Sequence, residues 1–214
     1  MQPEPHTFRA ADLVAGALAL DLVNTVTARD SQPRDWFADY AALLDWARQT
    51  GVFASAELLQ LDTLAQRQPL KARAALARIR RLREALCVLV YALGGQPAGA
   101  AVEQAALAQL DSDRRAAAQA ARLVLQPQGL AQEWTAQRSG LDLIAHVVAA
   151  QAVTCLQRLE LPRLRICAGH ACGWVFLDTS KSGRRRWCDM ATCGNSAKAQ
   201  RFQQAQRKRR GSGT

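Results

Sequence analysis

The 214-residue sequence lacks the segments that direct a chain into or through a membrane. Its first ten residues contain no basic stretch followed by an apolar run, so no signal peptide is indicated. The longest apolar stretch, residues 141–156, is interrupted by polar side chains and is shorter than a bilayer-spanning helix requires. These absences predict a cytoplasmic protein with no membrane partner.

Internal repeats, low-complexity linkers and catalytic pairings are also missing. The joint near residue 162 is short, so the parts on either side of it are expected to dock on each other. No nucleophile stands beside a general base, and we therefore predict that the protein is not an enzyme. One alternative stays open, an enzyme with its site around Asp21 and Asn24 in the N-terminal part.

Acidic residues are scarce in the last quarter of the chain. Residues 163–214 hold 12 Lys and Arg against 2 Asp and Glu, whereas residues 1–162 hold 16 of each kind. The whole formal charge of +10 therefore lies in the C-terminal part. Such asymmetry indicates a polyanionic partner, nucleic acid before anionic membrane.

Histidine is rare, with 3 residues, but there are 6 cysteines. Two of them, Cys87 and Cys155, stand alone in apolar helical contexts and are predicted to be small buried hydrophobes. His170 is predicted to be an exposed loop residue. The other four cysteines form two C-x4-C pairs separated by fifteen residues, which predicts a structural zinc site in a reducing compartment. These four are Cys167, Cys172, Cys188 and Cys193.

The residues around the cysteines predict a small zinc-dependent fold. Residues 174–177 favour a strand, residues 178–183 a turn and residues 184–187 a return strand, followed by a helix capped by Asn195 or Ser196. A hairpin and a helix in this order are typical of a treble-clef-like zinc finger. About fifty residues bury little apolar area, so the metal must supply folding energy that an aromatic cluster cannot. The predicted cluster consists of Trp174, Phe176, Trp187 and Phe202.

Cationic side chains lie on both predicted elements of this finger. Lys198 and Arg201 share one face of the helix, while three consecutive arginines belong to the predicted hairpin. A rigid module that presents cations from two elements is suited to sequence-independent phosphate contact, although a passive solubilising surface is the alternative. The three arginines are Arg184, Arg185 and Arg186.

Residues 1–162 predict a multihelical domain with one small β-hairpin. Asp21 and Asn24 lie on one helical face, either as a polar pair facing a ligand or as a buried structural pair. The arginines between residues 78 and 83 spread around their helix and predict a solvated face. Helices are expected over residues 35–50, 55–67, 69–93 and 140–159, two short helices between 97 and 121, and the hairpin over 122–126 and 130–135.

Three C-terminal segments resemble the CGNR zinc-finger family: the C-x4-C pair, GWVFLDTSKSGRRRWC, and CGN before a basic helix. The stretch LALDLVNT, residues 18–25, resembles the start of the ABATE-type domain that precedes this finger in the family. The resemblance implies a stress-induced transcription regulator with an ABATE-type helical domain over residues 1–162, a zinc finger over 163–210 and a tail over 211–214. The family pattern makes the four paired cysteines the ligands of one zinc ion and implies a first domain that senses a ligand or mediates dimerisation.

The sequence departs from the family pattern at one position. The motif that names the family ends in arginine, and Ser196 stands in that place. The four cysteines are untouched, but a phosphate contact would have to come from Lys198 or Arg201. We therefore predict a DNA-binding transcription regulator, with an RNA-binding or other nucleic-acid-associated zinc protein as the alternative. A homodimer would be the usual way to extend so small a DNA-contacting module.

Overall fold

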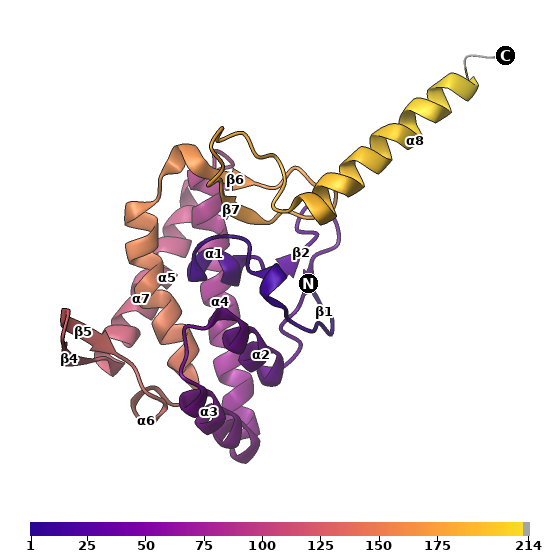
Figure 1. The fold of residues 1–214 in the computed structure, drawn as a ribbon. Helices are drawn as coiled ribbons and strands as arrows, with labels where there is room; N and C mark the ends of the chain where they lie inside the picture. The colour runs from indigo at the N-terminus through magenta and orange to yellow at the C-terminus, as the bar shows by residue number, and fades with distance from the viewer. Residues whose placement is uncertain (212–214) are drawn as a thin grey trace.

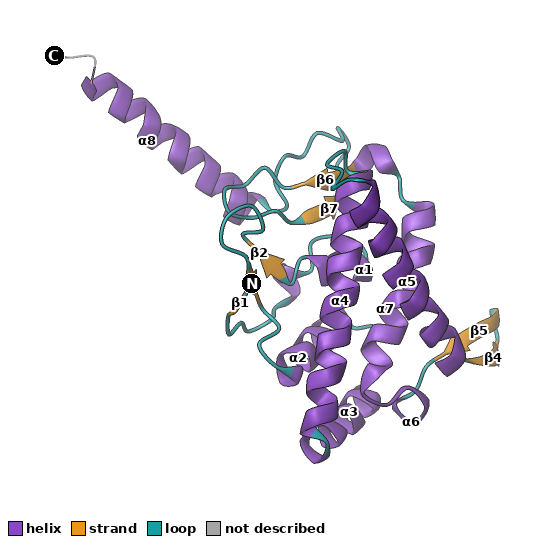
Figure 2. Ribbon diagram, turned by 180° about the vertical axis from the view of Figure 1, so that it is seen from behind, coloured by secondary structure: helices purple, strands orange, loops and turns teal. Residues whose placement is uncertain are grey.

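The computed structural model describes residues 1–211; beyond residue 200 it describes the side chains of Phe202, Gln203 and Gln206 only. The chain is mainly helical with small two- and three-stranded sheets, which confirms the predicted fold class (Figures 1 and 2). The helices are α1 (Leu18–Val23), α2 (Tyr40–Thr50), α3 (Ser55–Arg67), α4 (Pro69–Leu93), α5 (Ala100–Ala120), α6 (Ala136–Ser139), α7 (Leu143–Arg158) and α8 (Asn195–Gly211). The strands are β1 (Gln2–Pro3), β2 (Val26–Thr27), β3 (Arg34–Asp35), β4 (Arg122–Gln126), β5 (Gly129–Glu133), β6 (Leu164–Ile166) and β7 (Val175–Leu177).

The helices α4, α5 and α7 pack side by side and form the centre of the molecule (Figure 2). Buried side chains recur every three or four residues along α4, as an amphipathic helix requires. Pro69 occupies the first turn of α4 and Gly94 follows its last residue, so both bounds match the prediction. Together with α1 to α3, these helices enclose one continuous hydrophobic core.

Two helix predictions were wrong. Helix α2 begins at Tyr40 rather than at residue 35, because Asp35 pairs with Val26 in the small sheet and Asp39 caps the helix through the amide of Ala42 at 2.9 Å. Helix α5 runs unbroken where two short helices were expected. Its Asp111 pairs with arginines one turn ahead, so it supports the helix instead of capping a new one.

The helical run Ala136–Arg158 is long enough and apolar enough to cross a membrane by length and composition alone, which corrects the prediction that this stretch is too short. The core helix of a globular fold has the same properties, and α7 packs here on α1, α4 and α5. Its buried residues, including Ile144 and Val148, belong to the hydrophobic core.

Two small β elements lie at the edges of the helical body. The strands β4 and β5 pair antiparallel as predicted, with Leu125 opposite Leu130. A second sheet has the strand order β1–β3–β2. Figure 1 shows the β4–β5 hairpin near the lower end of the bundle and the cysteine-containing segment near the upper end.

The finger contains a hairpin, but not the predicted one. Strand β7 pairs with β6, which precedes the first cysteine pair, and the register places Leu164 opposite Leu177. The predicted return strand, residues 184–187, is irregular. Helix α8 follows the second cysteine pair and extends away from the rest of the molecule (Figure 1).

Candidate metal centre and nucleic-acid interface

The four paired cysteines come together in one cluster within the finger. Their sulfur atoms all lie within 4.8 Å of one another, and the Cys172 and Cys188 sulfurs are 3.8 Å apart. The Cys188 and Cys193 sulfurs are 3.7 Å apart. A tetrahedral zinc site with Zn–S bonds of about 2.3 Å requires sulfur separations of about 3.8 Å. The donor set and its spacing therefore fit a zinc ion.

The first cysteine pair is held by the turn between β6 and β7. The Cys167 amide donates to the Trp174 carbonyl at 2.7 Å, which closes the turn. A side chain at Gly169 would place its Cβ atom 2.9 Å from the Cys193 sulfur, so this position has no room for one. The amides of Gly169 and Cys188 each donate to the Cys167 sulfur at 3.3 Å. Such bonds stabilise a thiolate.

The second pair spans the start of the C-terminal helix. Asp189 caps the turn Met190–Gly194 by accepting from the Thr192 amide at 2.8 Å. This turn carries Cys193 and continues directly into α8. The predicted caps were therefore wrong: Asn195 instead donates to the Ala191 carbonyl at 3.2 Å, and Asp189 has the capping role.

The crowding of the sulfurs determines their ionisation. Hydrogen bonds from Cys172 and Cys188 lower the pKa of Cys167, while the same contacts raise the pKa values of those two neighbours. Burial raises the pKa of Cys193. The protein groups alone thus favour one thiolate, whereas a divalent cation favours ionisation of all four. His170 is exposed and lies outside the cluster, as predicted.

A buried aspartate replaces the expected return strand. Asp178 accepts hydrogen bonds from the amides of Ser180, at 3.0 Å, and Arg185, at 2.7 Å. The guanidinium of Arg185 lies 4.7 Å from the Phe176 ring centroid and donates to the Cys188 carbonyl. Arg185 therefore braces the second cysteine pair from inside the finger, a role that its place in a run of arginines did not indicate.

Other predicted cations are on the surface. Arg184 and Arg186 flank Arg185 and are exposed, and Lys198 is exposed on the first turns of α8. The side chain of Arg201 lies outside the described residues. Phe202 is 65% exposed, so its predicted place in the aromatic cluster was wrong. The aromatic side chains that pack around the cysteines are Trp174, Phe176 and Trp187.

Asp21 and Asn24 form hydrogen bonds with the backbone of two different residues. The Asn24 side chain donates to the Val175 carbonyl at 2.9 Å and accepts from the Val175 amide at 2.8 Å. It thus joins α1 to β7 of the finger. Asp21 accepts from the Ala15 amide at 3.0 Å, and burial raises its pKa to about 6.

The finger is docked on the helical domain through several further contacts. The Ala28 amide donates to the carbonyl of Cys172 at 3.1 Å, and the Tyr91 hydroxyl donates to the Gly173 carbonyl. Leu164 and Val175 belong to the core of the helical domain. The metal centre is thus built against the N-terminal part of the chain.

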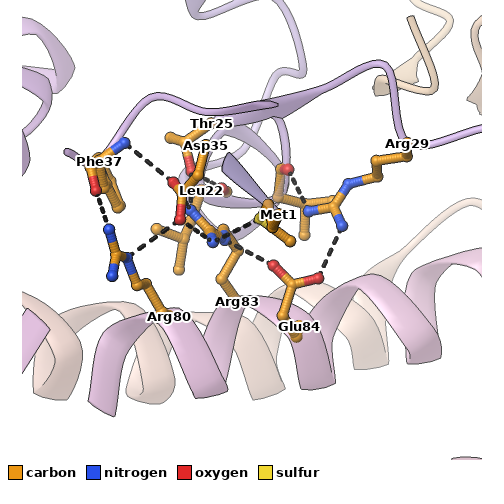
Figure 3. Close-up of polar contacts among 10 residues, drawn as sticks. Met1, Leu22, Thr25, Arg29, Asp35, Phe37, Arg80, Arg83 and Glu84 are labelled. Atoms are coloured by element: carbon orange, nitrogen blue, oxygen red, sulfur yellow. Dashed lines mark hydrogen bonds and ion pairs between the residues drawn. The ribbon is translucent and has the colours of Figure 1, made fainter. Parts of the chain in front are cut away.

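A second polar cluster joins α4 to the segment between residues 25 and 35 (Figure 3). Arg83 on α4, predicted to be solvated, is only 1% exposed and forms a bidentate pair with Asp35 at 2.7 and 2.9 Å. Its Nε donates to Glu84, which also accepts from Arg29 at 2.8 Å. Burial opposes ionisation of both carboxylates, but the arginines hold the pKa values of Asp35 and Glu84 below their ordinary range. The sequence reasoning missed this cluster because its partners are far apart along the chain.

The fold and the sulfur cluster define a helical protein with a four-cysteine zinc finger. A model of the CGNR zinc finger matches residues 163–208. The ABATE model, described as "Putative stress-induced transcription regulator", matches residues 16–158, two thirds of the chain. The chain therefore belongs to the ABATE family and carries a CGNR zinc finger, as its sequence indicated. No match is found among curated proteins.

Proposed function

We propose that this protein is a DNA-binding transcription regulator whose finger is folded by one structural zinc ion. The observation that carries the proposal is the connection between the sulfur cluster and two cationic segments. Cys188 ends the segment with Arg184 and Arg186, and Cys193 leads into the helix with Lys198. One closed metal centre would thus fix both segments in a single rigid unit.

The proposed contacts are made to phosphate groups. Arg184, Arg186 and Lys198 are exposed cations, and the excess positive charge of the chain lies in the finger and tail. Such contacts position a protein on a duplex without reading bases. Arg185 acts here as a brace of the metal centre, and Arg201 is retained as a candidate from its sequence position alone. Ser196, where the family motif has arginine, adds no charge.

The proposal is tested by titrating the zinc-loaded full chain with labelled duplex DNA at several salt concentrations. We expect the logarithm of affinity to fall with the logarithm of salt, by about 0.9 per phosphate neutralised. The double variant Arg184→Glu/Arg186→Glu should bind more weakly and with a shallower slope. The matched control is Arg67→Glu/Arg73→Glu on α3 and α4, which reverses two exposed arginines outside the finger.

The outcomes separate the alternatives. Absence of binding at low salt would refute the nucleic-acid role. Equal or tighter binding of single-stranded RNA would favour the RNA-binding alternative over DNA. An equal loss in the Arg67→Glu/Arg73→Glu control would indicate a general charge effect and not a finger surface.

We propose further that the N-terminal domain acts by binding, as a ligand sensor or dimerisation unit, and not by catalysis. Asp21 and Asn24, the residues of the enzyme alternative, are both engaged with backbone groups. Turnover of a metabolite that is lost in Asp21→Ala would overturn this assignment.

A further inference from the structure

A cavity of about 530 Å³ that is widely open to solvent lies between α4 and α5, next to the buried arginine cluster. This volume is within the range of small-molecule sites. The polar residues of its lining are Arg80, Arg81, Arg83, Asp35, Glu84 and Gln109. The apolar residues are Met1, Ala85, Val88, Val102, Ala105 and Ala106. The cavity therefore suits a molecule with one polar and one apolar end.

The buried guanidinium of Arg83 is incompletely matched by oxygen acceptors. Four of its five N–H groups point to oxygen atoms of Asp35, Thr25 and Glu84. The remaining contact, at 3.6 Å, is with the sulfur of Met1, which also lines the cavity. A thioether is a weak acceptor, so a carboxylate oxygen at that place would be a stronger partner.

Arg81 supplies a second donor at the mouth of the same cavity. Its side chain is exposed and makes no hydrogen bond or ion pair within the described part of the chain. Three arginines of the lining face two carboxylates, and one of these carboxylates also pairs with Arg29, so the polar groups carry an excess of positive charge. That excess favours an anion, and the planar guanidinium groups match the geometry of a carboxylate.

We propose that this cavity binds a small carboxylate with an apolar body. The carboxylate would lie between Arg81 and Arg83, with the apolar end between α4 and α5. The proposal gives a ligand class to the sensing role suggested for the N-terminal domain. The biological role of this binding rests on the proposed function, but the binding itself is measured without DNA and is tested independently.

The test is a calorimetric titration of the zinc-loaded full chain with benzoate and with hexanoate at constant ionic strength. At least one acid should bind saturably with a Kd below about 1 mM, and its neutral amide, benzamide or hexanamide, should bind at least about 10-fold more weakly. Inorganic phosphate should not compete. Equal binding of acid and amide, tighter binding of phosphate, or no saturable binding of either acid would overturn the proposal.

Three variants locate the site. Arg81→Gln should weaken binding of the acid about 10-fold, as expected for a lost charge-assisted hydrogen bond. Ala105→Trp should fill the cavity from an exposed position and abolish binding. The matched control is Arg114→Gln, which alters the mostly apolar cavity formed by α4, α5 and α7. Loss of binding in Arg114→Gln with none in Arg81→Gln would place the ligand elsewhere and refute the assignment. Circular dichroism confirms that each variant is folded.

Discussion

The finger and the helical domain bury polar groups in opposite ways. In the finger, three of the four clustered cysteines are buried around few apolar side chains, so the polar groups are themselves the centre of the fold. In the helical domain, Arg83 and Asp35 are buried beside a large apolar core that packs without them. The cysteine cluster of the finger requires an added metal cation, whereas Asp35 in the helical domain already has the cationic side chain of Arg83.

This difference predicts different responses to the loss of one group. Removing a charge partner in the helical domain leaves an unpaired ion, but most of the core stays intact. Removing a sulfur ligand takes away the interaction around which the finger is ordered. The finger is nevertheless not independent, since Asn24 and the core residues Leu164 and Val175 tie it to the helices.

The largest expected effect comes from removing the metal site. Cys188→Ser should abolish zinc binding and unfold the finger, because structural zinc supplies about 10–16 kcal/mol in comparable small modules. Most of the helical signal in circular dichroism should remain, and limited proteolysis should cut within residues 163–210. Elemental analysis should give one zinc per wild-type chain. Cys155→Ser, outside the cluster, is the control and should retain zinc. A metal-free chain with a protected finger would contradict the distinction between the two regions.

The next largest effect is expected in the buried ion pair. Asp35→Asn leaves the Arg83 guanidinium without its main counter-charge and should lower the free energy of unfolding by about 3–5 kcal/mol. Asp45→Asn, which breaks an exposed pair with Arg48, is the control and should cost less than about 1 kcal/mol. Chemical denaturation measures both.

The Arg83–Asp35 pair makes the free energy of unfolding depend on pH. Burial alone would raise the pKa of Asp35, but Arg83 holds it below its ordinary value of 3.8. A lowered carboxyl pKa stabilises the fold above the ordinary pKa, and this contribution is lost as the pH falls through the folded value. The difference between wild type and Asp35→Asn should therefore be constant near neutrality and shrink below pH 3.8. A difference that grows on acidification would contradict this account.

The connection between the regions is tested at Asn24. Asn24→Ala leaves a buried amide and a buried carbonyl of Val175 unpaired, which should cost about 2–4 kcal/mol. Hydrogen exchange should increase first in β7 and its neighbours, and zinc should be released to a chelator faster. Asn195→Ala, which removes one exposed side-chain bond, is the control and should change exchange little. Unchanged exchange in β7 would show that docking depends on the apolar contacts alone.

The parts that sequence patterns predicted are local. The bounds of α4 follow from Pro69 in its first turn and Gly94 after its last residue, and the β4–β5 hairpin follows from the turn at Pro127 to Gly129. The cysteine spacing likewise predicted which sulfurs would meet. In each case, the residues that decide the structure lie within a few positions of one another or in a repeated pair.

The features that were missed depend on partners far apart in the sequence. Asn24 meets Val175 151 positions later, and Arg83 meets Asp35 48 positions earlier. The arginine run 184–186 looked uniform, but Asp178 draws the backbone of its middle residue inward. Periodicity and propensity do not encode such pairings, since each depends on which surfaces the tertiary fold brings together.

The smallest expected effect is a gain in stability at Asp21. Burial raises the pKa of this carboxyl from 3.8 to about 6, so the folded state holds a proton that the unfolded chain releases. The associated stability is fully present below pH 3.8 and is lost as the pH rises through about 6. Asp21→Asn keeps an oxygen that can accept from Ala15 but cannot ionise. It should therefore increase the free energy of unfolding by about 1–3 kcal/mol at pH 8 and by almost nothing below pH 4. Equal stability of the two proteins at pH 8 would mean that Asp21 ionises without cost, and would reopen the possibility that this carboxylate serves a ligand instead of the fold.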